Sequence, residues 1–200
     1  THKSLSFNPN SILSYLSFRY VIGENTFLKD VFDVMPGEKI ELGEGIKKTN
    51  FWEISLDKQI DLGENYFVDK LENEFQDTIK RQLISDVNVG AFISGGLDSS
   101  LILYHMKKLM PNIQTFSTGF EDSEYDETKF AEMISHKFGL HMDKTIVNED
   151  NFLKNMASAL NARGEPNAIP HEIPFYLMSK KMKGNIKVVL SGEGADELFG

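Results

Sequence analysis

The 200-residue chain carries 21 Lys plus Arg against 30 Asp plus Glu, which gives a formal net charge of −9. This acidic balance disfavours a nucleic-acid binder, which needs cationic stripes to neutralise phosphates. No apolar run approaches the ~18–20 residues of a membrane span, and no signal-peptide apolar region follows Thr1. Without cysteine there is no disulfide, thiolate metal site or cysteine nucleophile. We therefore expect a soluble, cytoplasmic globular protein that binds neither nucleic acid nor membrane.

The first sixty residues are rich in turns and short in periodic pattern. Ser11 is expected to cap a brief helix. Residues 38–42 alternate polar and apolar like a half-buried strand, and Gly43-Glu44-Gly45 turns the chain into a second strand over 46–52. This segment is interpreted as a small appendage with a β-hairpin, and its residues alone suggest no chemistry.

After residue 60 the pattern alternates between strands and helices. Asp126 is a candidate N-cap for one of these helices. Such alternation predicts an α/β fold with a doubly wound parallel sheet, whose ligands sit at the carboxyl ends of the strands. Strands are expected over 87–93, 113–120, 141–147 and 186–190, and helices over 64–85, 99–110, 127–138, 151–162 and 173–183.

The loop after the first of these strands reads Ser94-Gly95-Gly96-Leu97-Asp98-Ser99-Ser100. Two glycines let the backbone approach a ligand, and the amides at the start of the next helix favour an anion. The serine hydroxyls add donors, so the loop suits phosphates, and Asp98 fits there if Mg²⁺ bridges it to phosphate oxygens. No Lys-Ser/Thr pair follows, so this is not a Walker A loop. The sequence is similar to the PP-loop of ATP pyrophosphatases; the alternative is a plain tight turn capped by serine.

A second strand end, Ser191-Gly192-Glu193-Gly194-Ala195-Asp196-Glu197, combines glycines with three carboxylates. So many like charges are costly unless a cation or a base neutralises some of them. Asp196 is a candidate ligand of the same Mg²⁺ as Asp98, and Glu193 a candidate general base or contact for a substrate amine. The alternative is a solvated acidic helix start.

Together, the two loops resemble the synthetase domain of the glutamine-dependent asparagine synthetases. The resemblance extends through Met35-Pro36-Gly37, Phe51-Trp52, residues 115–120 and residues 173–179. It implies the adenine nucleotide alpha hydrolase-like fold of PP-loop ATPases. The implied enzyme is a carbon–nitrogen ligase with glutamine as amide donor. ATP adenylates the side-chain carboxylate of aspartate and pyrophosphate leaves; ammonia then displaces AMP and gives asparagine.

The resemblance also assigns roles to individual residues. Glu193 and Asp98 would be catalytic, and Asp98 and Asp196 would coordinate Mg²⁺. Adenosine contacts would come from Ile93, Thr118 and the Ser191-Gly192 backbone. The whole set expected to bind ATP and pyrophosphate is Ile93, Ser94, Gly95, Gly96, Leu97, Asp98, Ser99, Ser100, Thr118, Ser191 and Gly192.

This sequence also departs from the family pattern. The glutaminase domain, with its terminal cysteine nucleophile, is absent, so residues 1–60 are interpreted as its trailing segment or a linker. Residues 61–200 would be an ATP-pyrophosphatase domain truncated at its C-terminus, before the family's catalytic lysine. Gly164-Glu165-Pro166 stands where many members have Asp-Glu-Pro. We therefore expect a fragment or a reduced protein that binds nucleotide but is not necessarily active alone.

Two alternatives stay open. One is a related amidotransferase or cyclase acting on another carboxylate, of a sugar or β-lactam precursor; the other is a nucleotide-binding module without full activity. The expected partners are small molecules, an aspartate-like carboxylate and ammonia from glutamine, and a homodimer is left open.

Overall fold

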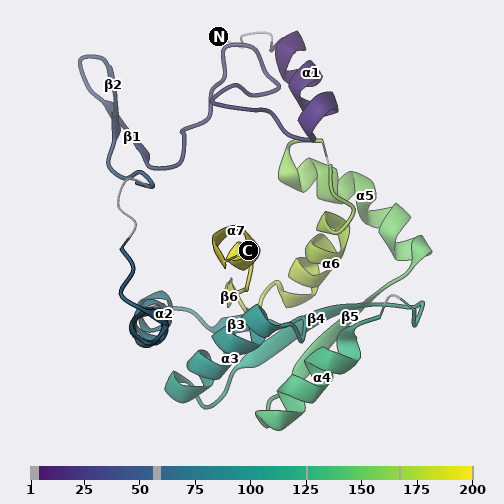
Figure 1. The fold of residues 1–200 in the computed structure, drawn as a ribbon. Helices are drawn as coiled ribbons and strands as arrows, with labels where there is room; N and C mark the ends of the chain where they lie inside the picture. Colours follow the sequence, from purple (N-terminus) through teal and green to yellow (C-terminus); the bar gives the residue numbers. More distant parts are fainter. Residues whose placement is uncertain (1–4, 56–59, 125, 167, 200) are drawn as a thin grey trace. The chain divides into compact units, whose positions relative to one another are not determined.

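A computed structural model describes residues 5–55, 60–124, 126–166 and 168–199 of the chain. The chain divides into two compact units, with the boundary between Asp61 and Leu62 (Figure 1). Among the described residues, no helix combines the length and the apolar character needed to cross a membrane.

The N-terminal unit contains one helix and one hairpin. Helix α1 spans Pro9–Phe18 and begins after Asn8, whose side chain accepts a hydrogen bond from the Asn10 amide. The expected cap, Ser11, is instead a buried residue inside the helix. Strands β1 (Glu38–Leu42) and β2 (Ile46–Asn50) pair antiparallel from Leu42–Ile46 to Glu38–Asn50, as the sequence predicts.

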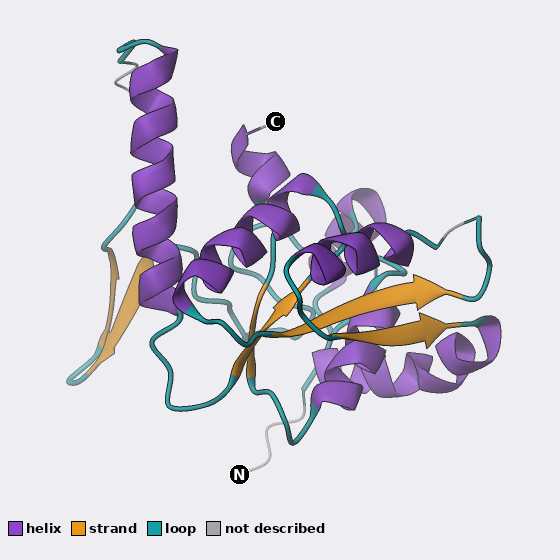
Figure 2. Ribbon diagram, turned by 90° about the horizontal axis from the view of Figure 1, so that it is seen from below, coloured by secondary structure: helices purple, strands orange, loops and turns teal. Residues whose placement is uncertain are grey.

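The second unit is built on a four-stranded parallel sheet with the order β5-β4-β3-β6. Helices cover both of its faces (Figure 2), so the predicted α/β, doubly wound fold class is confirmed. The strands are β3 (Val89–Phe92), β4 (Gln114–Phe120), β5 (Met142–Val147) and β6 (Val188–Leu190). The helices are α2 (Glu64–Gln82), α3 (Leu97–Leu109), α4 (Thr128–Lys137), α5 (Glu149–Arg163), α6 (Glu172–Met182) and the short α7 (Ala195–Phe199).

Strand β3 is buried on both faces, which explains its uninterrupted small and apolar sequence. Val89, Ala91 and Ile93 join a core with α2, α3 and α4, whereas Phe92 packs with residues of α6. Figure 1 shows α3 and α4 on one side of the sheet and α5 and α6 on the other.

The strand order reverses beside β3. From β3 the chain proceeds outward through β4 to β5, and then returns through α5 and α6 to β6 on the opposite side of β3. In open α/β sheets, the crevice at such a reversal is where ligands bind, at the carboxyl ends of the strands. Both loops singled out in the sequence leave the sheet here, after β3 and after β6.

Candidate active site

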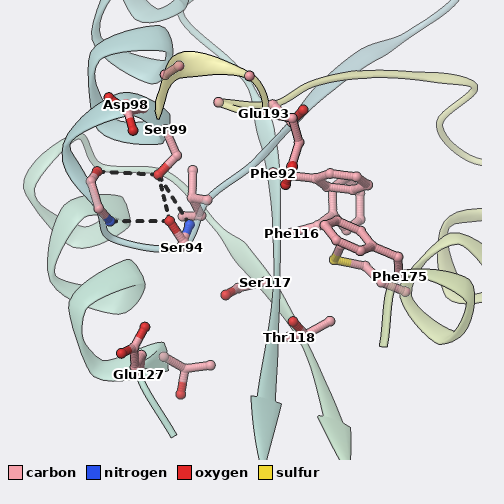
Figure 3. A pocket seen from close by; sticks show the side chains of 18 of the residues that line it. Phe92, Ser94, Asp98, Ser99, Phe116, Ser117, Thr118, Glu127, Phe175 and Glu193 are labelled. Atoms are coloured by element: carbon pink, nitrogen blue, oxygen red, sulfur yellow. Dashed lines mark hydrogen bonds between the residues drawn. The ribbon is translucent and has the colours of Figure 1, made fainter. Parts of the chain in front are cut away.

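A pocket of about 380 Å³ lies at the carboxyl ends of β3, β4 and β6 (Figure 3). Its walls come from the loop after β3, the loop after β6 and the beginnings of α3, α4 and α7, together with α6. The lining residues range from Phe92 to Glu197 in the sequence, and the sheet topology brings them together.

The loop after β3 is held by a closed set of hydrogen bonds. The Gly96 amide donates to Ser94 Oγ (3.3 Å), the Ser94 and Ser99 hydroxyls are 3.0 Å apart, and Ser99 Oγ donates to the Gly96 carbonyl (3.3 Å). The Ser94 amide also donates to Ser99 Oγ, at 3.3 Å. Ser99 is buried, and both Ser94 and Ser99 line the pocket (Figure 3).

Helix α3 begins earlier than the sequence predicts. Gly96 is its N-cap residue and Leu97 its first helical residue, so Asp98 lies in the first turn. The free amides of that turn are therefore contributed by the loop residues themselves, and the start of a helix favours an anion.

The loop after β6 lies directly against this first turn. A Cβ atom on Gly192 would come within 2.9 Å of the Ser99 nitrogen and 3.0 Å of Asp98 Cβ. Only a residue without a side chain allows this approach, and it places the backbone of one loop on the backbone of the other. The two loops therefore form one continuous wall, as the sequence interpretation requires.

Most of the predicted site residues line the pocket. They are Ile93, Ser94, Gly96, Asp98, Ser99, Thr118, Ser191, Gly192, Glu193 and Asp196. Three are not among the lining residues, namely Gly95, Leu97 and Ser100. Leu97 is 81% exposed, and the Ser100 hydroxyl donates to the Gly96 carbonyl at 2.6 Å.

Gly95 faces helix α4 rather than the pocket. Its φ is +86°, and an added Cβ would lie 2.4 Å from Phe130 Cβ and 2.6 Å from the Ala131 nitrogen. The first glycine of the pair is thus required because the loop rests on α4, a constraint that the sequence motif alone does not reveal.

An apolar wall opposite the serines was not predicted from the sequence. Phe92, Phe116 and Phe175 lie on this side of the pocket with Met178, and the Phe92 and Phe175 ring centroids are 5.8 Å apart. Phe175 and Met178 belong to α6, so no local motif connects them to the loops. In Figure 3 the Glu193 side chain points into the space beside Phe92.

The beginning of α4 also contributes to the pocket, through Glu127 and the buried Thr128. Together with Ser117, which precedes the expected residue Thr118, they were missed in the sequence. A sequence signal existed for these residues, because Ser117 lies in β4 beside Thr118, and Glu127 and Thr128 follow this strand, whose carboxyl end was expected to face the ligand.

The charge of the pocket is strongly negative. The described lining residues include five carboxylates, Asp98, Glu127, Glu193, Asp196 and Glu197, and no Lys, Arg or His. A polyphosphate fits such a site only together with hard cations, for which carboxylate and phosphate oxygens are suitable ligands. No cluster of three or more His, Cys, Asp or Glu that could hold a metal by itself occurs among the described residues.

Gly164 stands where many members of the resembled family have aspartate, and this difference has a structural basis. Gly164 is the C-cap residue of α5, with a φ of +80°, and its amide donates to the Leu160 carbonyl at 2.9 Å. A left-handed C-cap favours glycine over aspartate. Gly164, Glu165 and Pro166 line a separate hollow between α5 and α6, not the pocket described above.

Comparison with known proteins shows the family to which the chain is similar. The family "Asparagine synthase" matches residues 70–200. Asparagine synthetase [glutamine-hydrolyzing] 1 of Bacillus subtilis (strain 168) is 31% identical over 199 residues, covering 98% of this chain and 31% of that protein. A putative asparagine synthetase [glutamine-hydrolyzing] 2 of Methanocaldococcus jannaschii is 31% identical over 195 residues, covering 94% of this chain and 36% of that protein.

Among solved structures, an NH3-dependent NAD synthetase from Campylobacter jejuni matches with a TM-score of 0.45 and 19% identity. The match covers 66% of this chain and 60% of that one. The chain spans about a third of the length of the two curated relatives named above. The family match extends over most of the chain and includes both loops of the pocket, so the chain belongs to the asparagine synthase family.

Proposed function

We propose that the pocket binds Mg²⁺-ATP and forms the ATP site of an amide-forming ligase of the asparagine synthetase kind. The observation that supports this most is the contact between Gly192 and the first turn of α3, which joins the two loops into one site. A plain strand-to-helix turn requires no such approach by a second glycine loop.

In the proposed site, the loop after β3 holds the phosphates. Backbone amides at the start of α3 are the available donors, and Ser99 holds the loop in place through its three hydrogen bonds. Donors that are positioned in advance stabilise the charge that develops on departing pyrophosphate at no cost in reorganisation. The remaining Ile93, Thr118, Ser191 and Gly192 are assigned to adenosine.

Asp98 and Asp196 are the proposed Mg²⁺ ligands, and both line the pocket. The ion would neutralise phosphate charge in a pocket that otherwise carries five carboxylates. With the phosphates so held, a substrate carboxylate is oriented toward the α-phosphorus, whose bond to the bridging oxygen breaks as pyrophosphate leaves.

Glu193 is proposed to act beside the reacting carboxylate. Its side chain points into the pocket next to the apolar wall, away from the serine side (Figure 3). It is placed to accept a hydrogen bond from an amine, either ammonia or the amino group of an aspartate-like substrate. Delivery of ammonia from glutamine, and the assignment of residues 1–60 to the end of a glutaminase segment, belong to this proposal.

Calorimetry with Mg²⁺-ATP tests the proposal on the 200-residue chain. We expect saturable heat that is lost in Asp98→Ala. Asp150→Ala is a matched control, because Asp150 also lies in the first turn of a helix, α5, but outside the pocket. Binding that survives Asp98→Ala unchanged would contradict the assignment of the loop.

Exchange of labelled pyrophosphate into ATP tests which carboxylate the site adenylates. Exchange that depends on aspartate supports an asparagine-forming reaction. Exchange with a sugar-derived or β-lactam-precursor carboxylate, but not with aspartate, would instead assign a different amidation or cyclisation to the same site. Binding of Mg²⁺-ATP without any exchange would indicate a nucleotide-binding module.

A further inference from the structure

We propose that Asp126 is a positioning residue for the phosphate-binding loop. It fixes the first turn of α4, and α4 in turn supports the loop at Gly95. This inference rests on the proposed function for its effect on phosphate binding, but its structural part concerns the ligand-free protein.

The contact between loop and helix is direct. Gly95 lies so close to Phe130 and Ala131 that even one methyl group would collide with the helix backbone, at 2.5–2.6 Å. A shift of the first turn of α4 would therefore move Gly95, or leave a gap beneath it. Because Gly95 and Gly96 lie between Ser94 and Asp98, such a shift reaches the groups that face the pocket.

Asp126 holds that first turn through Thr128, although the N-cap residue of α4 is Glu127 and not Asp126 as expected from the sequence. The Asp126 carboxylate accepts the Thr128 amide (3.2 Å) and the Thr128 hydroxyl (2.7 and 2.8 Å to the two oxygens). Thr128 is 1% exposed, so these bonds hold a buried residue at the first position of the helix. The same carboxylate packs against Gly119 of β4, where an added Cβ would lie 2.6 Å from Asp126 Oδ1.

Lys144, on the neighbouring strand β5, also holds the start of α4. We call Asp126, Thr128 and Lys144 together the anchor. Lys144 of β5 places its Nζ 3.4 Å from Asp126 Oδ2 and 3.3 Å from Glu132 Oε1 of α4. The hydrogen bond from Thr128 lowers the pKa of Asp126, with further help from Lys144. Burial opposes the charged form of Lys144, yet its hydrogen bonds to Glu132 and Asp126 raise its pKa overall. Both groups are therefore charged at neutral pH, and together they tie α4 to the sheet.

The anchor also lies next to the pocket wall. Gly119 follows Thr118, and the two residues after Asp126, Glu127 and Thr128, line the pocket themselves. Asp126 is not a lining residue. Its influence on a bound phosphate therefore passes through the helix and the loop, not through contact.

The test compares Asp126→Asn and Lys144→Met with two controls. Asp122→Asn is matched in chemistry, because the Asp122 side chain also accepts a hydrogen bond from the amide two residues ahead (3.0 Å). Asp122 has no lysine partner among the described residues and does not line the pocket. Ile113→Val reduces stability at a buried core residue away from the site. On the ligand-free protein, we measure the amide NMR signals of Gly95 and Gly96. By titration with Mg²⁺-pyrophosphate, we measure the Kd of its complex with each variant.

We expect Asp126→Asn and Lys144→Met to shift the Gly95 and Gly96 signals and to weaken pyrophosphate binding by about tenfold, or about 1.4 kcal/mol. Asp122→Asn and Ile113→Val should leave both unchanged. Unaltered glycine signals in both anchor variants would overturn the inference, as would equal effects in Ile113→Val. If Asp126→Asn does not fold, Lys144→Met decides alone. Shifted glycine signals in a protein that binds no pyrophosphate would support the anchor and contradict the proposed function.

Discussion

Replacing Gly192 by alanine is the sharpest perturbation of the contact between the two loops. Gly192 has no positive φ, so its backbone accepts alanine, and any effect comes from the new methyl group alone. That group would lie 2.9 Å from the Ser99 nitrogen and 3.0 Å from Asp98 Cβ, where ordinary contacts begin at 3.4 Å. The loops must therefore separate by about half an ångström.

Because the loops separate within the pocket wall, both the stability of the protein and its affinity for Mg²⁺-ATP should fall. Overpacking against backbone costs about 1–3 kcal/mol, and a chain of this size loses about 2–4 °C in Tm per kcal/mol. For binding, a misplacement of ~1 Å costs up to ~100-fold, so half of that should weaken Mg²⁺-ATP by roughly tenfold. Thermal unfolding and calorimetry measure the two effects in the same samples.

Gly43→Ala is the matched control for this experiment. Gly43 also lacks a positive φ, and an added Cβ there meets nothing within 4 Å. We expect Gly43→Ala to unfold at the wild-type temperature and to bind Mg²⁺-ATP with wild-type affinity. If Gly192→Ala behaves in the same way, the loops are not in the contact on which the site depends.

Three further predictions concern the parts that support this contact. Gly95→Ala should destabilise the protein more than Gly192→Ala, because it combines a φ of +86° with a collision at 2.4 Å; equal melting temperatures would contradict this. Ser99→Ala leaves the Ser94 amide without its bond and should cost about 1–3 kcal/mol in urea unfolding, whereas wild-type stability would show that the hydroxyl network is dispensable. The lowered pKa of Asp126 predicts stability that is complete above its ordinary value of 3.8 and is lost as the pH falls through the lowered value. Asp126→Asn should therefore lose less stability than wild type between about pH 5 and pH 2, and parallel losses would refute this.

Local patterns predicted the architecture well, because each strand and each of the five longer helices of the second unit is signalled within its own segment; the short α7 was not among the predicted helices. The continuous apolar run that became β3 is required by its burial on both faces. Boundaries were less accurate where a cap decides them. Helix α1 is capped by Asn8 rather than by Ser11, and α3 begins at Leu97 because Gly96 serves as its N-cap residue.

The site was predictable where its residues follow strands and not where they come from elsewhere. Asp98 and Glu193 were found because their loops combine glycines with polar groups at strand ends. Phe175 was not, because an aromatic residue on an amphipathic helix is ordinarily core, and only the packing of α6 on the sheet brings it to the pocket. The packing of Gly95 against Phe130 and Ala131 of α4 is likewise a contact between residues distant in sequence, so the motif alone did not predict it.

The most direct test of the account is an NMR titration of the isotope-labelled chain with Mg²⁺-ATP. Binding at the junction of the loops predicts that amide signals of residues 94–100 and 191–197 change together and saturate with one Kd. Changes confined to only one of these segments, or located at the hollow between α5 and α6, would contradict a site built jointly by the two loops.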